Sequence, residues 1–248
     1  MKAMIFAAGL GTRLKPLTDS RPKALVPVAG RPLLQWQIER LKAFGITDII
    51  INVHHFGQQI IDFLKAHSNF GCSILVSDER DELLDTGGGL YKAIEDNHLN
   101  EPILAVNVDI LSTLDYPTLI NEPLDIATLV VSDRKTQRYL CFDEAGELKG
   151  WTNIATGALR NIESTDGLRL LAFSGTQVVS PAILPYMAAM GKKVFSLVDL
   201  YLTIPHGVRA FVPIDYTMID VGKLEVLGSD KLQRMVDTVY RTTTTKGH

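Results

Sequence analysis

Short apolar runs alternate with amphipathic stretches along the first half of the chain. Four runs rich in aliphatic residues predict strands, at 3–8, 48–53, 72–77 and 103–108. Three stretches with apolar residues at helical spacing predict helices, at 33–44, 58–66 and 87–95, the last with Thr86 as its cap. Because the Ile-Ile-Ile run within 48–53 is typical of a strand buried on both faces, the alternation predicts a three-layer α/β fold around a mostly parallel sheet.

The second half has a more β-rich pattern. Residues 138–142 and 147–151 flank Asp-Glu-Ala-Gly, a turn signal that predicts a β-hairpin. Further strands are predicted at 168–179, 208–213 and 217–221. Helices are expected to start at Ser180-Pro181 and at Ser196, because serine caps a helix and proline suits its first turn.

Composition narrows the classes of function. With 248 residues, 46% hydrophobic and 21% charged, the chain is typical of a globular enzyme with a sizeable core. A net charge of -3 without a basic block gives no support for nucleic-acid binding. No apolar run approaches the roughly 20 residues of a membrane span. Because glycines and Arg13 interrupt the only early apolar stretch, we expect no signal peptide and no membrane partner.

The two cysteines, Cys72 and Cys141, lie among strand-like residues. We expect both to be reduced residues of the core, because so few cysteines do not form a disulfide framework. Together with the missing signal peptide, this favours a cytoplasmic protein.

The first predicted strand runs into Ala8-Gly9-Leu10-Gly11-Thr12-Arg13. Two glycines one residue apart let the backbone turn tightly and bring its N–H groups against an anion. Arg13 and the later Lys23 are cations that would hold a polyphosphate. The loop is not a dinucleotide fingerprint, because Leu14 stands in place of the third glycine, nor is it a P-loop. A plain strand-to-loop turn is the alternative interpretation.

Asp109 and Asp220 each follow an apolar strand-like run. Ligands of open α/β sheets bind outside the carboxyl ends of the strands, so Asp109 is expected to face that crevice; the alternative is that it caps the next turn. A carboxylate embedded as Asp220 is in 218–222 needs a partner if it is buried. Two such carboxylates, completed by triphosphate oxygens, would suit Mg²⁺.

Three glycines, at 87–89, open the third predicted helix. Each costs a helix about 1 kcal/mol relative to alanine, which indicates the close approach of a ligand such as a flat base. A flexible helix start is the alternative.

These segments resemble, in the expected order, the signature segments of the sugar-1-phosphate nucleotidylyltransferases. The matching segments are 7–18, Pro22-Lys23, 27–33, 86–89, Asp109, 173–175 and 220–222. Within the family, the chain is most similar to the branch of N-acetylmuramate-1-phosphate uridylyltransferases and mannose-1-phosphate guanylyltransferases. The resemblance implies a Rossmann-like three-layer αβα sandwich with a mixed, mostly parallel sheet and a small β-rich lobe that binds the sugar.

The resemblance also implies an activity in nucleotide-sugar biosynthesis. A nucleoside triphosphate, with UTP preferred, would react with N-acetylmuramate 1-phosphate or a similar hexose 1-phosphate and release pyrophosphate, with Mg²⁺ as cofactor. We also consider a mannose-1-phosphate guanylyltransferase, a cytidylyltransferase for phosphocholine, and a non-catalytic nucleotide-binding regulator. The joint presence of Arg13, Lys23, Asp109 and Asp220 argues against the regulator, because binding alone does not require the whole set.

The resemblance assigns roles position by position. Gly9 and Gly11 would present N–H groups to the phosphates, Arg13 would hold the β- and γ-phosphates, and Lys23 would reach the α-phosphate. Arg13 and Lys23 are thus the expected catalytic residues, and Asp109 and Asp220 the expected metal ligands. The other expected nucleotide-binding residues are Ala8, Thr12, Thr86, Gly87 and Gly88.

On the sugar side, the expected contacts are Asn107, Trp151, Asn153 and Gly175. The Glu-Lys-Pro segment of many relatives, whose lysine grips the sugar phosphate, is missing. Gly-Trp-Thr-Asn at 150–153 stands in the corresponding region, so Asn153 is the candidate replacement. Trp151 offers an aromatic face on which a sugar ring can stack.

We expect one domain over 1–248. A nucleotide-binding part would occupy about 1–125 and a sugar-phosphate-binding part about 126–222. Residues 223–241 form an amphipathic pattern that predicts one C-terminal helix, ahead of a polar tail from Thr242 that is expected to fray. That helix can pack internally or on a neighbour, so either a monomer or a small homo-oligomer is expected.

Overall fold

The computed structural model describes residues 1–241. The polar tail predicted from Thr242 onward therefore lies outside the described residues. Contacts divide the chain into two compact units. The first unit contains Met1–Leu84, Ala105–Leu114 and the chain from Thr217 onward, and the second contains Asp85–Leu104 and Asp115–Tyr216.

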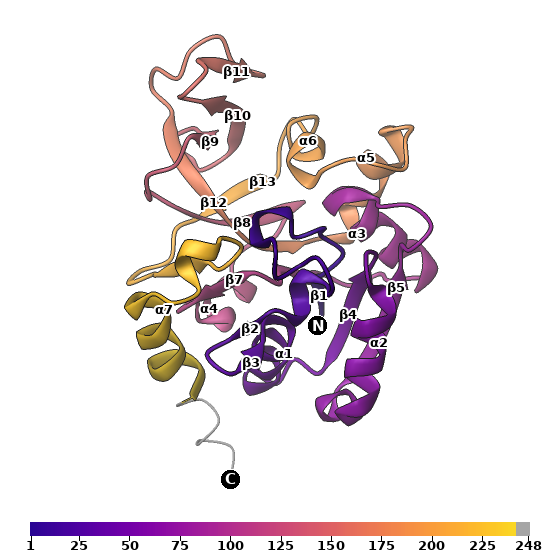
Figure 1. The fold of residues 1–248 in the computed structure, drawn as a ribbon. Helices are drawn as coiled ribbons and strands as arrows, with labels where there is room; N and C mark the ends of the chain where they lie inside the picture. Colours follow the sequence, from indigo (N-terminus) through magenta and orange to yellow (C-terminus); the bar gives the residue numbers. More distant parts are fainter. Residues whose placement is uncertain (242–248) are drawn as a thin grey trace. The chain divides into compact units, whose positions relative to one another are not determined.

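A parallel sheet forms the centre of the first unit (Figure 1). Its strands are β1 (Lys2–Phe6), β4 (Asp48–Val53), β5 (Ser73–Asp78) and the part of β6 (Ile103–Asn107) from Ala105 onward. They lie in the order β6-β1-β4-β5, with Ala3 opposite Ile49 and Ile50 opposite Leu75 in parallel register. Every residue of β4 after Asp48 is buried, which confirms the strand covered on both faces.

The two long helices of the first unit are α1 (Leu33–Ala43) and α2 (Gly57–Ala66). Both lie within one residue of their predicted bounds. In α1, Leu34, Ile38 and Leu41, which are apolar residues at helical spacing, are completely buried. Helical spacing therefore identified the side of α1 that enters the core.

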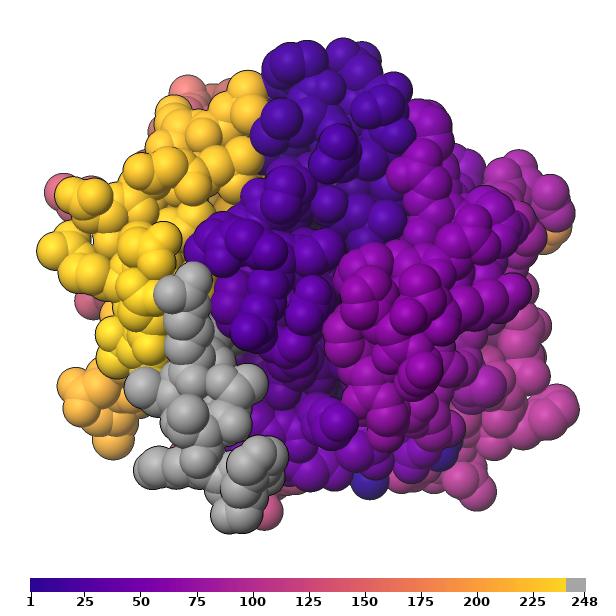
Figure 2. All heavy atoms as spheres, turned by 60° about the horizontal axis from the view of Figure 1, so that its bottom comes forward, coloured from indigo at the N-terminus to yellow at the C-terminus, as the bar shows by residue number. Residues whose placement is uncertain are grey.

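Short elements complete the first unit. They are η1 (Thr12–Leu14), η2 (Lys23–Leu25), η3 (Ser68–Gly71), the two-strand pairs β2 (Pro27–Val28) with β3 (Arg31–Pro32) and β7 (Ile110–Ser112) with β14 (Met218–Asp220), η5 (Leu224–Val226), α7 (Asp230–Met235) and the π-helix η6 (Val236–Arg241). Figure 2 shows the yellow C-terminal segment beside the indigo N-terminal residues of the same unit.

The C-terminal segment differs from the single helix predicted over 223–241. A break between η5 and α7 divides it, because the Ser229 hydroxyl accepts a hydrogen bond from the Leu232 N–H at 3.3 Å and caps a new helix. Leu232, Met235 and Val236 are buried as the pattern predicts, whereas Leu224 is exposed.

The second unit contains the predicted hairpin within a largely antiparallel sheet (Figure 1). Its strands are β8 (Ala127–Ser132), β9 (Arg138–Phe142), β10 (Leu148–Asn153), β11 (Ala158–Arg160), β12 (Arg169–Val179) and β13 (Val208–Phe211). Their order is β11-β10-β9-β12-β8-β13, and only the β13–β8 pair among these is parallel. The helices are α3 (Asp85–Asp96), α4 (Tyr116–Ile120), η4 (Pro181–Ile183), α5 (Leu184–Ala189) and α6 (Leu197–Tyr201).

Two of the three helix caps predicted in the second unit are confirmed. Ser180 and Ser196 cap η4 and α6 as predicted, with hydrogen bonds from Ala182 N–H and Asp199 N–H. Thr86 was predicted to cap the glycine-rich helix, but α3 begins one residue earlier, at Asp85. The Thr86 hydroxyl instead accepts a hydrogen bond from the Leu197 N–H at 3.0 Å.

Both cysteines are free, which agrees with the expectation of reduced thiols. Cys141 is buried, and this burial raises the pKa of its thiol to about 11. Cys72 is only half-buried, so its predicted place in the core was wrong; it lies just before the edge strand β5. Within residues 1–241, no helix has the length and apolar character needed to cross a membrane.

Ile50→Ala should destabilise the protein by about 2–5 kcal/mol, because it leaves a cavity in the fully covered strand β4. Ile50 is 1% exposed, whereas Ile214 is 92% exposed. The matched Ile214→Ala should change the free energy of unfolding by less than about 0.5 kcal/mol. Urea denaturation of both variants measures the difference; equal effects would contradict the placement of β4 in the core.

Candidate active site

The two strand-end carboxylates meet in the first unit. β14 pairs antiparallel with β7, which places Asp220 opposite Ile110. The Val221 N–H donates to the Asp109 carbonyl oxygen at 2.8 Å and continues the pairing toward Asp109. The helix α1 supports β7, since Gln37 Nε2 donates to the Ile110 carbonyl at 2.5 Å. Backbone pairing thus brings together two carboxylates that lie far apart in the sequence.

Arg13 and Lys23 join these carboxylates in one ion cluster. Lys23 Nζ lies 2.9 Å from Asp109 Oδ2, and Arg13 Nη2 lies 3.7 Å from the same oxygen. Arg13 Nη1 donates to Asp220 Oδ2 at 3.1 Å. The four residues that were expected to do chemistry therefore lie in one ion cluster of this unit, in which Asp109 contacts both cations and Asp220 contacts Arg13.

The contacts of the cluster differ in their exposure to water. The side chains of Lys23 and Asp109 are 15% and 7% exposed, whereas that of Arg13 is 56% exposed. Removal of one partner from a buried pair costs about 3–5 kcal/mol, because it leaves an uncompensated charge. An exposed pair such as Arg13–Asp220 contributes about 0–1 kcal/mol. The Lys23–Asp109 pair is thus the energetically important contact of the cluster.

Of the two glycines of the loop, Gly11 is required by its internal packing. Gly11 has a φ of +66°, and a Cβ atom there would lie 2.8 Å from Thr18 Cγ2 and 2.9 Å from Lys23 Cβ. Thr18 Oγ1 also donates to the Gly11 carbonyl oxygen at 2.9 Å. A Cβ atom on Gly9 would lie 3.5 Å from Lys23 Nζ. The loop therefore brings its backbone directly against the lysine that contacts Asp109.

Asn52 and Glu79 support the start of this loop, and neither was predicted from the sequence. Asn52 Oδ1 accepts hydrogen bonds from the N–H groups of Ala7 and Ala8 at 2.7 and 3.3 Å. Asn52 Nδ2 in turn donates to Glu79 Oε1 at 2.8 Å, and both side chains are buried. The signal in the sequence was an amide side chain within the otherwise apolar strand at 48–53.

Thr12 and Asn107, two further residues expected to contact substrate, also lie in the first unit. Thr12 begins the short helix η1, and Asn107 ends β6 two residues before Asp109, half-buried. His54 lies beside the supporting pair, with Nδ1 bonded to the Glu79 carbonyl oxygen at 2.6 Å. The expected substrate contacts of Thr12 and Asn107 stay predictions.

The glycine-rich start of α3 lies in the second unit. The N–H groups of Gly87 and Gly88 donate to the Phe195 carbonyl oxygen at 2.9 and 3.1 Å. A Cβ atom on Gly87 would lie 2.4 Å from the Phe195 ring. The close approach inferred from these glycines thus exists within the protein, and contacts of Thr86, Gly87 and Gly88 with a nucleotide stay predictions.

Trp151 of β10 lies opposite Arg160 of β11. The Arg160 guanidinium lies 5.7 Å from the centre of the Trp151 ring and contacts Asp199 Oδ1 at 2.7 Å. Desolvation raises the pKa of the Asp199 carboxyl, but hydrogen bonding and attraction to Arg160 outweigh it and hold that pKa below its ordinary value. Charge and aromatic surface therefore meet at this point of the sheet.

The two other sugar-side candidates have local structural roles. Asn153 Oδ1 accepts a hydrogen bond from the Ala155 N–H at 3.0 Å, within the turn between β10 and β11. Gly175 has a φ of +71°, which favours glycine, and lies where the β12–β8 register shifts between Phe173 and Gln177. Their contacts with a sugar phosphate stay predictions.

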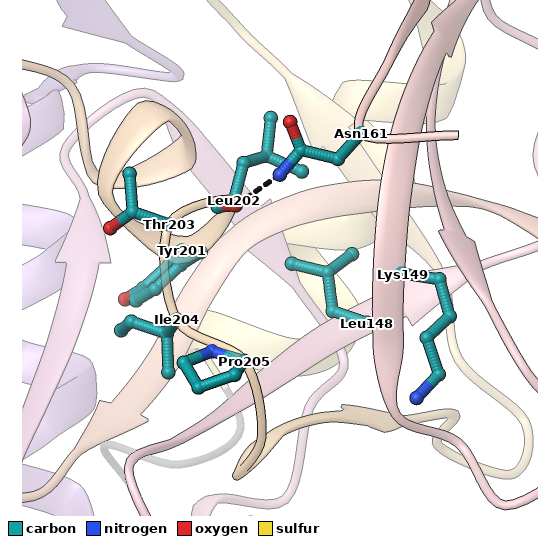
Figure 3. Close-up of a pocket in the computed structure, with 8 residues that line it drawn as sticks. All are labelled: Leu148, Lys149, Asn161, Tyr201, Leu202, Thr203, Ile204 and Pro205. Carbon is teal, nitrogen blue, oxygen red and sulfur yellow. Dashed lines mark hydrogen bonds between the residues drawn. The ribbon is translucent and has the colours of Figure 1, made fainter. Parts of the chain in front are cut away.

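A small hollow of about 190 Å³ lies in the second unit (Figure 3). Its lining consists of Leu148, Lys149, Asn161 and the segment Tyr201, Leu202, Thr203, Ile204, Pro205. Asn161 Nδ2 points to the Leu202 carbonyl oxygen and bonds it. Pockets for small molecules span about 300–1,000 Å³, so this hollow is too small for a nucleoside triphosphate, and no expected site residue lines it.

The carboxylates of the cluster fit a magnesium ion. Among residues 1–241, no group of three or more His, Cys, Asp or Glu side chains is placed to hold a metal by itself. Mg²⁺ prefers one or two carboxylates completed by phosphate oxygens, and Asp109 with Asp220 supplies such a donor set. Their oxygens already attract cationic groups, as the contacts of Lys23 and Arg13 show.

Gly222 should be essential to the cluster. A Cβ atom there would lie 2.6 Å from Asp109 Oδ2, 2.8 Å from Arg13 Nη2 and 2.9 Å from Asp220 Oδ1. Gly222→Ala should therefore cost about 1–3 kcal/mol of unfolding free energy through overpacking. Gly228→Ala is the matched control, because nothing lies within 4 Å of a Cβ atom there. Urea denaturation should show a clearly larger loss for Gly222→Ala; similar losses would contradict this geometry.

Two known enzymes of one name are similar to this chain. N-acetylmuramate alpha-1-phosphate uridylyltransferase of Caulobacter vibrioides is 32% identical over 192 residues, 73% of this chain and 76% of the relative. The enzyme of the same name from Neisseria meningitidis is 46% identical over 116 residues, 47% of this chain and 50% of the relative. The chain thus spans only half the length of the Neisseria relative.

The fold also matches a solved structure. The crystal structure of HddC from Yersinia pseudotuberculosis aligns with a TM-score of 0.72 and 25% identity, covering 90% of this chain and 95% of HddC. This likeness agrees with the predicted Rossmann-like α/β fold with its mixed sheet. The profile described as "Nucleotidyl transferase" matches residues 2–138, a range that contains the glycine loop, Lys23 and Asp109. The chain belongs to the nucleotidyl transferase family.

Proposed function

We propose that this protein is a sugar-1-phosphate nucleotidylyltransferase, which joins a nucleoside triphosphate to a sugar 1-phosphate and releases pyrophosphate. The single observation that carries the proposal is the ion cluster of Arg13, Lys23, Asp109 and Asp220 beside the Gly9–Gly11 loop. Its cations and carboxylates are the groups that a triphosphate and a divalent metal require together. The named activity of two relatives supports UTP and N-acetylmuramate 1-phosphate as the substrate pair.

The reaction would be an in-line displacement at the α-phosphorus. An oxygen of the sugar 1-phosphate forms the new P–O bond, while the bond from the α-phosphorus to the bridging oxygen breaks and pyrophosphate leaves with that electron pair. The attacking phosphate is already anionic, so no general base is required. Catalysis then rests on positioning and on stabilisation of charge.

The side chains of the cluster divide this work. Lys23 would meet the α-phosphate, where charge develops, and Arg13 would hold the β- and γ-phosphates. Asp109 and Asp220 would hold Mg²⁺, which when bound neutralises phosphate charge. The backbone of Ala8, Gly9, Gly11 and Thr12 would lie along the phosphates.

The remaining contacts are proposed from the family resemblance. Thr86, Gly87 and Gly88 would border the base, and Asn107, Trp151, Asn153 and Gly175 would meet the sugar phosphate. Support for Trp151 comes from its half-exposed ring beside the Arg160 guanidinium, since an aromatic face with a nearby cation suits an anionic sugar.

Pyrophosphate release in a substrate panel tests the proposal. UTP, GTP, CTP, ATP and dTTP are each combined with Mg²⁺ and with N-acetylmuramate 1-phosphate, mannose 1-phosphate or phosphocholine. We expect the fastest release with UTP and N-acetylmuramate 1-phosphate. Faster release with GTP and mannose 1-phosphate, or with CTP and phosphocholine, would replace the substrates, and no release with any pair would favour a non-catalytic regulator.

Lys23→Ala should lower turnover at least about 10²-fold, the usual effect of removing one charge-stabilising donor from a transition state. Lys15→Ala is the control, because it removes the same charge from the same loop while its partner is Asp19, 3.4 Å away and outside the cluster. Steady-state rates of pyrophosphate release compare the two variants. A rate near wild type for Lys23→Ala would exclude the role given to this lysine.

A further inference from the structure

We propose that the ion pairs of Arg13 and Lys23 with the metal-binding carboxylates compete with both ligands, so that metal ion and triphosphate bind favourably only together. Each ligand would have to displace the same ion pairs. The metal ion would free the two cations for the triphosphate, and the triphosphate would free the two carboxylates for the metal ion. The inference rests on the proposed function for the identity of the two ligands. The inference adds that the charged side chains of the site control the binding of both ligands.

The charges of the four side chains in the cluster balance one another. Two cations face two carboxylates, and Asp109 Oδ2 lies within 4 Å of both Lys23 and Arg13. Because Lys23 and Asp109 are mostly buried, solvent and salt screen their attraction less than that of surface pairs. The contacts of these four side chains are therefore satisfied without a ligand.

Backbone hydrogen bonds hold the Asp220 carboxylate and the main chain of Asp109, whereas the cations are on long side chains. The Gly222 N–H donates to Asp220 Oδ1 at 2.9 Å, and the Val221 N–H bonds the backbone of Asp109. These bonds use groups other than the Oδ2 atoms that Lys23 and Arg13 contact. An exchange of partners at the Oδ2 atoms thus requires Lys23 and Arg13 to move, and the strands can stay in place.

A divalent cation alone would bind poorly. Asp109 and Asp220 would hold it, and the Oδ2 atoms of both carboxylates are in contact with Lys23 or Arg13. Both side chains would then be unpaired beside an ion of the same sign. For the mostly buried Lys23, the loss of its partner is the larger part of this cost.

A triphosphate alone would meet the converse obstacle. Its oxygens would draw Lys23 and Arg13 away from the carboxylates. Asp109, with a side chain only 7% exposed, would be left as a buried and unpaired anion beside a polyanion. With metal and triphosphate both present, the carboxylates gain the metal as a partner and the two cations gain phosphate oxygens. Linkage then requires that each ligand strengthens the binding of the other by the same factor.

Binding measurements on Lys23→Met distinguish this exchange from a simple binding role. The variant lacks the cation that competes with a metal, so it should bind Mn²⁺ alone at least about ten-fold more tightly than wild type. It should also bind inorganic tripolyphosphate alone, in EDTA, more weakly. The electron paramagnetic resonance of free Mn²⁺ measures the metal affinity, and isothermal titration calorimetry measures the tripolyphosphate affinity. Tripolyphosphate makes the test independent of the nucleobase.

The control is Lys15→Met, which changes the net charge equally but lies outside the cluster. It should change neither affinity. Arg13→Met is the second variant, and since its side chain is half-exposed it keeps the test decisive should Lys23→Met fail to fold. It should shift Mn²⁺ affinity in the same direction. Unchanged or weaker binding of Mn²⁺ by the folded variants would overturn the inference.

The two proposals can fail separately. Tighter Mn²⁺ binding by Lys23→Met without pyrophosphate release by wild type would support the exchange and reject the proposed reaction. Pyrophosphate release by wild type without tighter Mn²⁺ binding in either variant would support the reaction and reject the exchange.

Discussion

The mostly buried contact between Lys23 Nζ and Asp109 Oδ2, 2.9 Å long, joins Lys23, beside the glycine loop, to the turn between β6 and β7. Two groups with so little access to water cannot be separated cheaply unless each finds another partner. The rest of the site follows from this requirement. Gly11 has no side chain because one would meet Lys23 and Thr18, and Gly222 has none because one would meet Asp109.

A second layer of polar contacts keeps the loop in place without touching the ion cluster. Asn52 receives the N–H groups of Ala7 and Ala8, and Glu79 receives the amide of Asn52. Both side chains are buried, so an unpaired atom among them would carry the full cost of desolvation. The strand β4 thus contributes to the site through the side-chain amide of Asn52, whereas its isoleucines pack in the core.

Much of the fold could be predicted because hydrophobic spacing reports which side of an element is buried. The strand at 48–53 and the helix at 33–44 needed no information beyond their own residues. The short strand β7 was not predicted, because its pairing with β14 is a tertiary contact between segments far apart in the sequence. The break before Ser229 was missed because apolar spacing continues across it.

The candidate site shows a similar division. Asp109 and Asp220 were noticed as carboxylates after apolar strands, and Arg13 and Lys23 as cations after a glycine loop. The family resemblance gave them their expected roles, and the structure brings them together. The glycines were more ambiguous, because a glycine indicates that other atoms lie close to the backbone but does not show which atoms these are. At Gly87 the neighbour is the Phe195 ring, and at Gly222 it is the ion cluster. A glycine therefore indicates a functional site only when the crowding atoms themselves carry the chemistry, as they do at Gly222.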